Sequence, residues 1–276
     1  MRPARALSLL AALALAGCGR APVPGHAGGA PKRVVSINPC VDAVLMRVAD
    51  RRQIAAISHY SQDPRASSIP LDVARRFRAT SGTAEEVIAL SPDLVIAGSH
   101  VSPATIAALA RLGIPVVQIG VPDSISDSVA QVRQIAAAVG HSDRGARLTG
   151  AIEGAVAAHP PGAPVPALIW QGGGLVPGAG TLPDDVLRAA GFRNMSADYG
   201  LQRWDVLPLE PLVARPPRVL LSVGRADQAD RMLSHPVLRA LGGRVAMRAY
   251  PERLLQCGGP TIIEAANRLA AIRRSL

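Results

Sequence analysis

Short apolar runs alternate with stretches of helical periodicity through most of the chain. Runs rich in Val, Ile and Leu predict buried strands at 33–37, 54–57, 94–97, 115–119, 167–171, 219–223 and 244–247. Apolar residues at helical spacing predict helices at 41–48, 83–90, 103–112, 183–190, 209–214 and 261–274. Strands that alternate with helices in this way predict parallel α/β units.

The middle of the chain lacks strand signals. From 124 to 159 apolar residues recur at helical spacing, with a break at Gly140-His141-Ser142, and this predicts two helices. The chain is therefore expected to hold an N-terminal α/β lobe at 32–123, a helical connector at 124–160 and a C-terminal α/β lobe at 161–276.

The first residues have the pattern of an export signal. Arg2 and Arg5 precede a short apolar run, and Leu15-Ala16-Gly17-Cys18 places small residues where a signal peptidase cuts. The apolar run is too short to cross a hydrocarbon core of about 30 Å. Leu15 to Cys18 resemble a bacterial lipobox, which implies cleavage before Cys18 and attachment of lipid to its thiol.

On this basis residues 1–17 are a signal peptide, and 18–31, rich in Pro, Gly and Ala, are a flexible tether between the lipid and the fold. The alternative is a plain signal peptide in which Cys18 is incidental. Gly19 leaves open whether the inner or the outer membrane holds the anchor.

Charge changes this interpretation little. The formal net charge is +10, and removing Arg2 and Arg5 leaves 28 basic residues (30 − 2) against 20 acidic ones. Basic proteins often bind nucleic acid, but an exported protein does not meet it in normal work. The arginines look scattered along the sequence, so the charge is expected to be solvated surface, with anionic lipid headgroups as an additional attraction.

Two segments, one in each predicted lobe, repeat a pattern. Residues 85–96 and 210–221 each begin with Glu, carry Ala and Pro at matching offsets and end in an apolar strand. Together with the lipobox and the helical connector, this pattern resembles the periplasmic substrate-binding proteins of ABC importers for iron chelates, haem and cobalamin. The resemblance covers about Arg33 to Leu276 and is strongest at 33–38, 85–98, 113–116 and 204–223.

That resemblance implies two Rossmann-like lobes joined by a single long helix, the class III arrangement, with a ligand cleft between them. In the family, one glutamate on each lobe docks into arginines of the membrane permease, and Glu85 and Glu210 occupy those positions. The alternative is that each glutamate only stabilises the first turn of its helix through the helix dipole.

Aromatic residues supply candidate ligand contacts. The cobalamin-binding member of the family has Ser-Tyr-Ser and a nearby proline where this chain has His59-Tyr60-Ser61 and Pro64, and it has a tryptophan six residues before its second docking glutamate, as Trp204 precedes Glu210 here. Flat rings suit the face of a corrin, a porphyrin or a catecholate. Trp170 is a candidate third wall of the cleft, and the alternative for all three rings is packing.

Histidines and cysteines complete the candidates. His59 and His100 could each reach the cleft and ligate an iron or cobalt centre, although a loop histidine is more often an ordinary polar group. Cys40 and Cys257 map to cleft-facing edges of different lobes. They are an interlobe disulfide, two inert thiols or a soft metal ligand.

The expected function is that of a monomeric, lipid-anchored binding protein. It captures a metal chelate, cobalamin first and ferric siderophore next, and delivers it to an ABC permease and its ATPase; haem is the alternative ligand. It is expected to have no catalytic residues, no resident metal or cofactor, and no nucleic-acid partner. An exported enzyme and an envelope scaffold are the other classes, but neither a Gly-x-Ser-x-Gly nor a His-Glu-x-x-His motif occurs.

Overall fold

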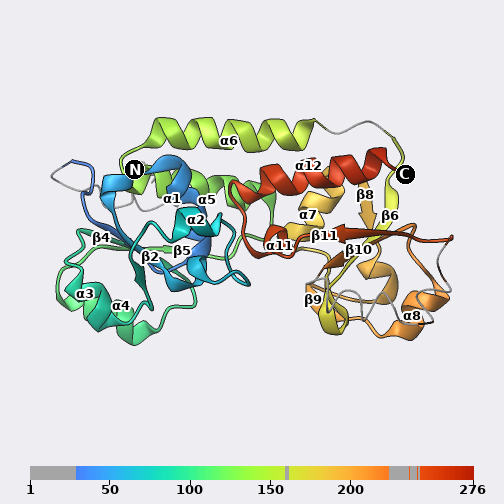
Figure 1. Ribbon diagram of the computed structural model, residues 1–276, viewed down its shortest axis with the longest axis horizontal. Helices are drawn as coiled ribbons and strands as arrows, with labels where there is room; N and C mark the ends of the chain where they lie inside the picture. The colour runs from blue at the N-terminus through green and yellow to red at the C-terminus, as the bar shows by residue number, and fades with distance from the viewer. Residues whose placement is uncertain (1–28, 159–161, 224–235, 237–240, 242) are drawn as a thin grey trace, which may run out of the picture.

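The computed structural model describes residues 29–158, 162–223, 236, 241 and 243–276. Two α/β lobes lie side by side, and a long helix runs across both of them on one side (Figure 1). Among the described residues, none of the helices combines the length and the hydropathy that a membrane span requires.

The N-terminal lobe is built on a parallel sheet of order β3-β2-β1-β4-β5. Its strands are β1 (Val34–Ser36), β2 (Ile54–Ser58), β3 (Ala79–Thr80), β4 (Leu94–Gly98) and β5 (Val116–Ile119). Its helices are α1 (Pro39–Val48), η1 (Arg51–Gln53), η2 (His59–Gln62), α2 (Leu71–Ala74), α3 (Ala84–Ala89) and α4 (Pro103–Arg111). The strand order reverses at β1 and β4, and in open α/β sheets ligands bind beyond the carboxyl ends of the strands at such a point.

The C-terminal lobe has a parallel sheet of order β11-β10-β6-β8 and a two-stranded antiparallel pair, β7 and β9. Its strands are β6 (Val165–Trp170), β7 (Leu175–Pro177), β8 (Phe192–Asn194), β9 (Trp204–Val206), β10 (Val219–Val223) and β11 (Ala246–Tyr250). Its helices are η3 (Gly172–Gly174), α7 (Leu182–Ala189), η4 (Ser196–Tyr199), α8 (Leu209–Ala214), α11 (Arg253–Gln256) and α12 (Thr261–Arg274).

The connector consists of α5 (Ile125–Ala138) and α6 (Ser142–Ala157), which pack against each other. Gly140 makes the turn between them with φ 80°, a conformation that glycine adopts without strain. Of the two helices, α6 is the one that reaches from the first lobe to the second in Figure 1. Residues of α1, α5, α6, α7 and α12 share one apolar core with both main sheets, so the lobes are packed together rather than hinged on a free linker.

Candidate functional site

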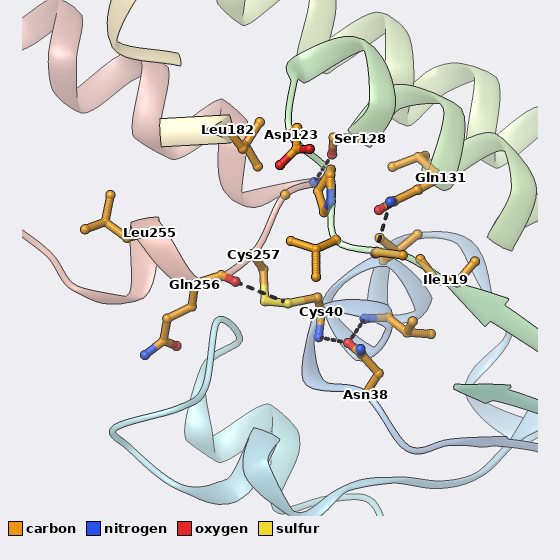
Figure 2. A pocket seen from close by; sticks show the side chains of 18 of the residues that line it. Asn38, Cys40, Ile119, Asp123, Ser128, Gln131, Leu182, Leu255, Gln256 and Cys257 are labelled. Carbon is orange, nitrogen blue, oxygen red and sulfur yellow. Dashed lines mark hydrogen bonds between the residues drawn. A yellow bond between two sulfur atoms is a disulfide. The ribbon is translucent and has the colours of Figure 1, made fainter. Parts of the chain in front are cut away.

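A pocket of about 240 Å³ lies between the lobes, and both lobes and the connector line it. The N-terminal lobe contributes Asn38, Cys40 and the 119–123 segment, α5 contributes Ser128 and Gln131, and the C-terminal lobe contributes 181–183, Trp204 and 255–259. Figure 2 shows this arrangement around Cys40 and Cys257. Its walls are mainly aliphatic, with amide and hydroxyl groups at a few points, as is usual for small-molecule sites.

Asn38 shapes the N-terminal side of the pocket. It follows β1, and its side-chain oxygen accepts hydrogen bonds from the N–H groups of Cys40 (2.8 Å) and Val41 (3.2 Å), which caps α1. Gly98, at the end of β4, has no room for a side chain because a Cβ there would clash with the Asn38 amide. Asn38, the residue that caps α1, is thus packed against the end of β4 at the point where the strand order reverses.

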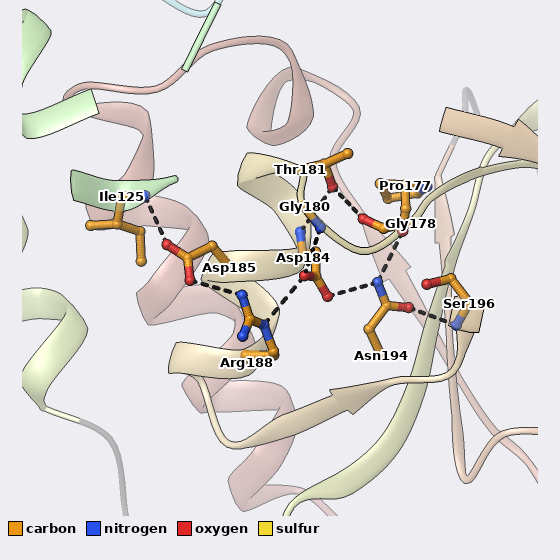
Figure 3. Close-up of polar contacts among 10 residues, drawn as sticks. All are labelled: Ile125, Pro177, Gly178, Gly180, Thr181, Asp184, Asp185, Arg188, Asn194 and Ser196. Atoms are coloured by element: carbon orange, nitrogen blue, oxygen red, sulfur yellow. Dashed lines mark hydrogen bonds and ion pairs between the residues drawn. The ribbon is translucent and has the colours of Figure 1, made fainter. Parts of the chain in front are cut away.

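A buried carboxylate organises the opposite wall. Asp184 in α7 is 4% exposed, and its carboxylate accepts hydrogen bonds from Asn194 Nδ2 (3.1 Å) and the Gly180 N–H (3.3 Å). Thr181 caps α7, so the pocket residues 181–183 are held by this network (Figure 3). Asp185 accepts the N–H of Ile125 at 2.8 Å, which ties α7 to the first turn of α5. Asp184 and Asp185, which begin α7, therefore also hold the pocket wall and the connector in place.

The structure joins Cys40 and Cys257 in a disulfide between residues 217 positions apart, with the two Cα atoms 5.1 Å apart. Cys40 belongs to α1, and Cys257 lies between α11 and α12, so the bond links one lobe to the other at the pocket wall. Neither sulfur is then a free thiolate for a soft metal. Within the part of the chain that the structure describes, acidic, His and Cys side chains do not gather in groups of three or more that could hold a metal ion.

Gly258 and Gly259 allow the two lobes to approach closely behind the disulfide. A Cβ at Gly258 would clash with Ser128. Gly259 has φ 62°, and a Cβ there would lie only 2.9 Å from a methyl group of Val44, which is also too close. The Gly259 N–H donates to Ser128 Oγ at 2.7 Å in a buried contact. Both positions need glycine, one for space and the other also for its backbone conformation.

Polar contacts cross the cleft on either side of the pocket. Arg203 forms an ion pair with Asp123 at 2.8 Å, and Gln256 Nε2 donates to the Arg65 carbonyl oxygen at 2.5 Å. Arg203 has φ 50°, which is unusual for a residue other than glycine, and it directly precedes Trp204. The lobes are therefore joined by polar contacts as well as by the disulfide.

The predicted aromatic residues do not share one location. Trp204 is 44% exposed and lines the pocket. Tyr60 is 52% exposed and lies with His59 in η2, at the carboxyl end of β2, outside the pocket lining. Trp170 is 5% exposed and packs in a C-terminal core cluster with Leu168 and Leu220, so it is a packing residue rather than a wall of the pocket.

His59 has a defined hydrogen bond. Its Nδ1 lies 3.2 Å from the Thr80 carbonyl oxygen, and its ring centroid lies 4.1 Å from that of Tyr60. A carbonyl oxygen can only accept, so Nδ1 carries a proton, and in the neutral imidazole Nε2 then has the free lone pair. His100, after β4, is exposed and is not among the residues that line the pocket.

Asp42 anchors the segment that carries Tyr60. This carboxylate is fully buried in α1, and its Oδ2 accepts hydrogen bonds from Ser61 Oγ (2.6 Å) and the Ser58 N–H (3.0 Å). Burial raises the pKa of Asp42 to about 7, and the nearby Ser36 hydroxyl and the hydrogen bonds from Ser61 and Ser58 offset part of that rise. The sequence analysis missed Asp42; its only signal was an acidic residue on the apolar side of a predicted helix.

Glu85 and Glu210 are both exposed and both occupy the second position of their helices, α3 and α8. Neither side chain makes an ion pair or hydrogen bond within the described part of the chain. Glu86 differs, because its carboxylate accepts from Thr80 Oγ1 (2.9 Å) and the Ser81 N–H (2.7 Å), contacts that hold its pKa below the usual value. In Figure 1, α3 and α8 lie on the side of the lobes opposite α6.

Comparison with known proteins agrees with this architecture. Residues 34–242 match the family model described as periplasmic binding protein. Over 212 residues the chain is 28% identical to the cobalamin-binding protein of Halobacterium salinarum, an alignment that covers 74% of this chain and 57% of that protein. The chain thus spans little more than half the length of the curated relatives it matches.

Solved structures show the same fold. The apo periplasmic haem-binding protein RhuT of Roseiflexus sp. RS-1 matches with a TM-score of 0.70 at 23% identity, covering 87% of this chain and 97% of that one. The periplasmic vitamin B12-binding protein BtuF of Vibrio cholerae matches with a TM-score of 0.66 at 16% identity, covering 89% and 97%. These relatives are binding proteins and not enzymes, and the expected class III fold is confirmed. By its family match and its two lobes, the chain belongs to the periplasmic binding protein family.

Proposed function

We propose that this protein is the lipid-anchored substrate-binding component of an ABC importer and that it captures a metal chelate between its lobes. The observation that carries the proposal is the interlobe pocket, which has aliphatic walls and the exposed indole of Trp204 at its C-terminal side. Such a surface suits the apolar edge and flat face of a large ring. Lipid on Cys18 would hold the protein near the permease.

Cobalamin is the preferred chelate, and a ferric siderophore is the next. The preference rests on the likeness to a cobalamin-binding protein and on the aromatic residues Tyr60 and Trp204, one from each lobe. Both rings are exposed, so each is available to a ligand that enters from the open side of the cleft.

Tryptophan fluorescence tests the proposal directly, because the chain has two tryptophans and only Trp204 lines the pocket. In a Trp170→Phe variant the remaining emission comes from Trp204, and we expect cobalamin to quench it. Replacing Trp204 by Ala should weaken binding measured by calorimetry by about 10-fold or more, since a well-packed aromatic contact contributes on the order of 1–2 kcal/mol. Unquenched emission with cobalamin, haem and ferric siderophores alike would refute the binding function.

Haem is a second candidate, and His59 favours it. Its Nδ1 donates to the Thr80 carbonyl oxygen, so Nε2 is the nitrogen that would bind a metal, and metal-ligating histidines typically donate their other ring N–H in this way. If haem is the cargo, adding it should give a six-coordinate Soret spectrum that His59→Ala converts to another form. His100→Ala is the matched control and should leave the spectrum unchanged. An identical spectrum in His59→Ala would remove this candidate.

A further inference from the structure

Basic side chains gather at one edge of the N-terminal sheet. Lys32 precedes β1, Arg51 and Arg52 precede β2, and Arg75, Arg76 and Arg78 precede β3. These three strands are parallel neighbours in the order β3-β2-β1, so the segments before them lie together at the amino end of the sheet. We call these six residues the basic edge. It lies away from the carboxyl end of the sheet, where the pocket is.

Contacts between the segments confirm that the basic edge is one surface. Lys32, Arg51 and Arg52 line a common open groove. The Arg51 guanidinium lies 4.9 Å from the centre of the Phe77 ring and donates to the Arg76 carbonyl oxygen at 3.1 Å. The arginines that look scattered in the sequence are therefore clustered here by the strand order.

Most of this charge is not neutralised. Asp72 pairs with Arg76, and Asp50 is shared by Arg144 (2.8 Å) and His141 from the connector. Asp93 accepts the backbone N–H of Lys32. Across the described residues, the side chains of Lys32, Arg52, Arg75 and Arg78 have no ion pair or hydrogen bond. Some arginines elsewhere, such as Arg193 and Arg253, are paired with carboxylates.

The N-terminal segment joins the fold at the basic edge. Gln53, next to Arg52, donates from Nε2 to the Pro31 carbonyl oxygen at 2.7 Å. Cys18 precedes Gly29, the first described residue, by 11 positions (29 − 18). Whatever its conformation, a segment of that length spans at most about 40 Å. A lipid on Cys18 would therefore keep the basic edge close to the membrane that holds the anchor.

We propose that the basic edge binds the anionic headgroups of phospholipids at that membrane. Arginine guanidinium groups match phosphate oxygens in pairs, and unpaired cations near an anionic surface are attracted within about a Debye length. The lipid anchor and the basic edge would then act as two signals, which together hold a protein more firmly than either alone. The inference rests on the proposed anchoring for its location and does not depend on which chelate is bound.

Vesicle sedimentation tests the proposal with the exported chain carrying Cys18→Ser, so that no lipid contributes. We expect binding to phosphatidylcholine vesicles only when they contain phosphatidylglycerol, and we expect added salt to abolish it. The triple variant R52Q/R75Q/R78Q should lower the partition coefficient by about 100-fold, because each basic residue near the surface contributes roughly 5-fold. These three side chains have no partners within the described chain, so the variant should fold.

The matched control is R111Q/R147Q/R274Q, which removes three exposed arginines from α4, α6 and α12. It should leave the partition coefficient nearly unchanged. An equal loss in the control, equal binding to neutral vesicles, or tighter binding to a DNA oligonucleotide than to the anionic vesicles would each overturn the proposal. Cobalamin, haem and siderophore titrations of the triple variant keep this outcome separate from the proposed function, because the basic edge does not line the pocket.

Discussion

Asp42 is buried without a cationic partner, and it links α1 to the segment of Tyr60. Its Oδ2 receives two hydrogen bonds, while its Oδ1 has no partner among the described residues. A neutral carboxyl fits such a site better than a charged one, because burial penalises the charge more than two hydrogen bonds compensate.

The raised pKa of Asp42 predicts a pH dependence of stability. The folded protein keeps this proton up to about pH 7, whereas the unfolded chain loses it near the ordinary pKa of 3.8. The contribution of Asp42 to the free energy of unfolding should therefore fall as pH rises from about 4 to 7 and then level off. Urea unfolding at several pH values should show this slope in the parent protein and a flatter profile in Asp42→Asn.

Asp50→Asn is the control for that experiment. Asp50 is held ionised by a hydrogen bond from Arg144, so its pKa is lowered and its contribution is lost only as pH falls below the ordinary value. Its replacement should leave the slope between pH 4 and 7 in place. Equal slopes in the parent and in Asp42→Asn would mean that Asp42 is ionised in the folded state.

At the site, the sequence could identify candidate residues but not the surroundings that decide their roles. Trp204 and Trp170 look alike as candidates, but the first lies on β9, the exposed strand of an antiparallel pair, and the second ends a central buried strand. Separate apolar clusters cover the two faces of β6, one with Ala167 and Ile169 and the other with Leu168 and Trp170, and the local sequence does not show which elements pack on each face. The Gly258-Gly259 pair can be read from the sequence. That both positions require glycine cannot, because the close contacts with Ser128 and Val44 depend on how the lobes meet.

Among the helices and strands, hydrophobic periodicity predicted most of the longer elements. Helices 209–214 and 261–274 and strand 219–223 lie where periodicity predicts them, as α8, α12 and β10. The unpredicted elements are short: α2, α11, β3, β7, β8, β9 and the 3-10 helices η1 to η4. A strand of two or three residues is defined by its partner rather than by its own composition. Trp204 to Val206, for example, are all exposed, so burial does not alternate along this strand.

The helices α3 and α8 allow a sharp test of permease docking. Charge reversal of Glu85 and Glu210 to Arg should reduce chelate uptake in cells by at least 10-fold and leave chelate affinity unchanged, because the charged groups would repel arginines of the permease. Uptake of labelled chelate and binding to the purified protein are the two measurements.

Asp143→Arg is the matched control for that test. Asp143 is also exposed and also occupies the second position of its helix, but α6 lies on the other side of the molecule. The Asp143→Arg replacement removes a favourable interaction with the helix dipole, as the reversals at Glu85 and Glu210 do. If Asp143→Arg impairs uptake as much as the double reversal, the two glutamates serve their helices and not docking.

The disulfide, the connector and the contacts across the cleft hold the two lobes in one relative position. Removing the disulfide by Cys40→Ser and Cys257→Ser, in a Cys18→Ser background, should lower the free energy of unfolding by roughly 2–5 kcal/mol. It should also let the ligand-free lobes separate, which small-angle scattering would detect as a larger radius of gyration. Reduction of the parent protein should reproduce both changes. Unchanged scattering would mean that α5, α6 and the shared core fix the lobes without the covalent bond.

The same disulfide changes the topology of the chain. Everything from Val41 to Gln256, including the connector and every strand of the two main sheets except β1, lies inside a covalent ring that closes at Cys40 and Cys257. A protease that cuts once inside the ring opens a circle and does not release a fragment. Where proteases are present, a nicked molecule would keep both lobes together. It would run as one species in a gel until a reductant separated the pieces.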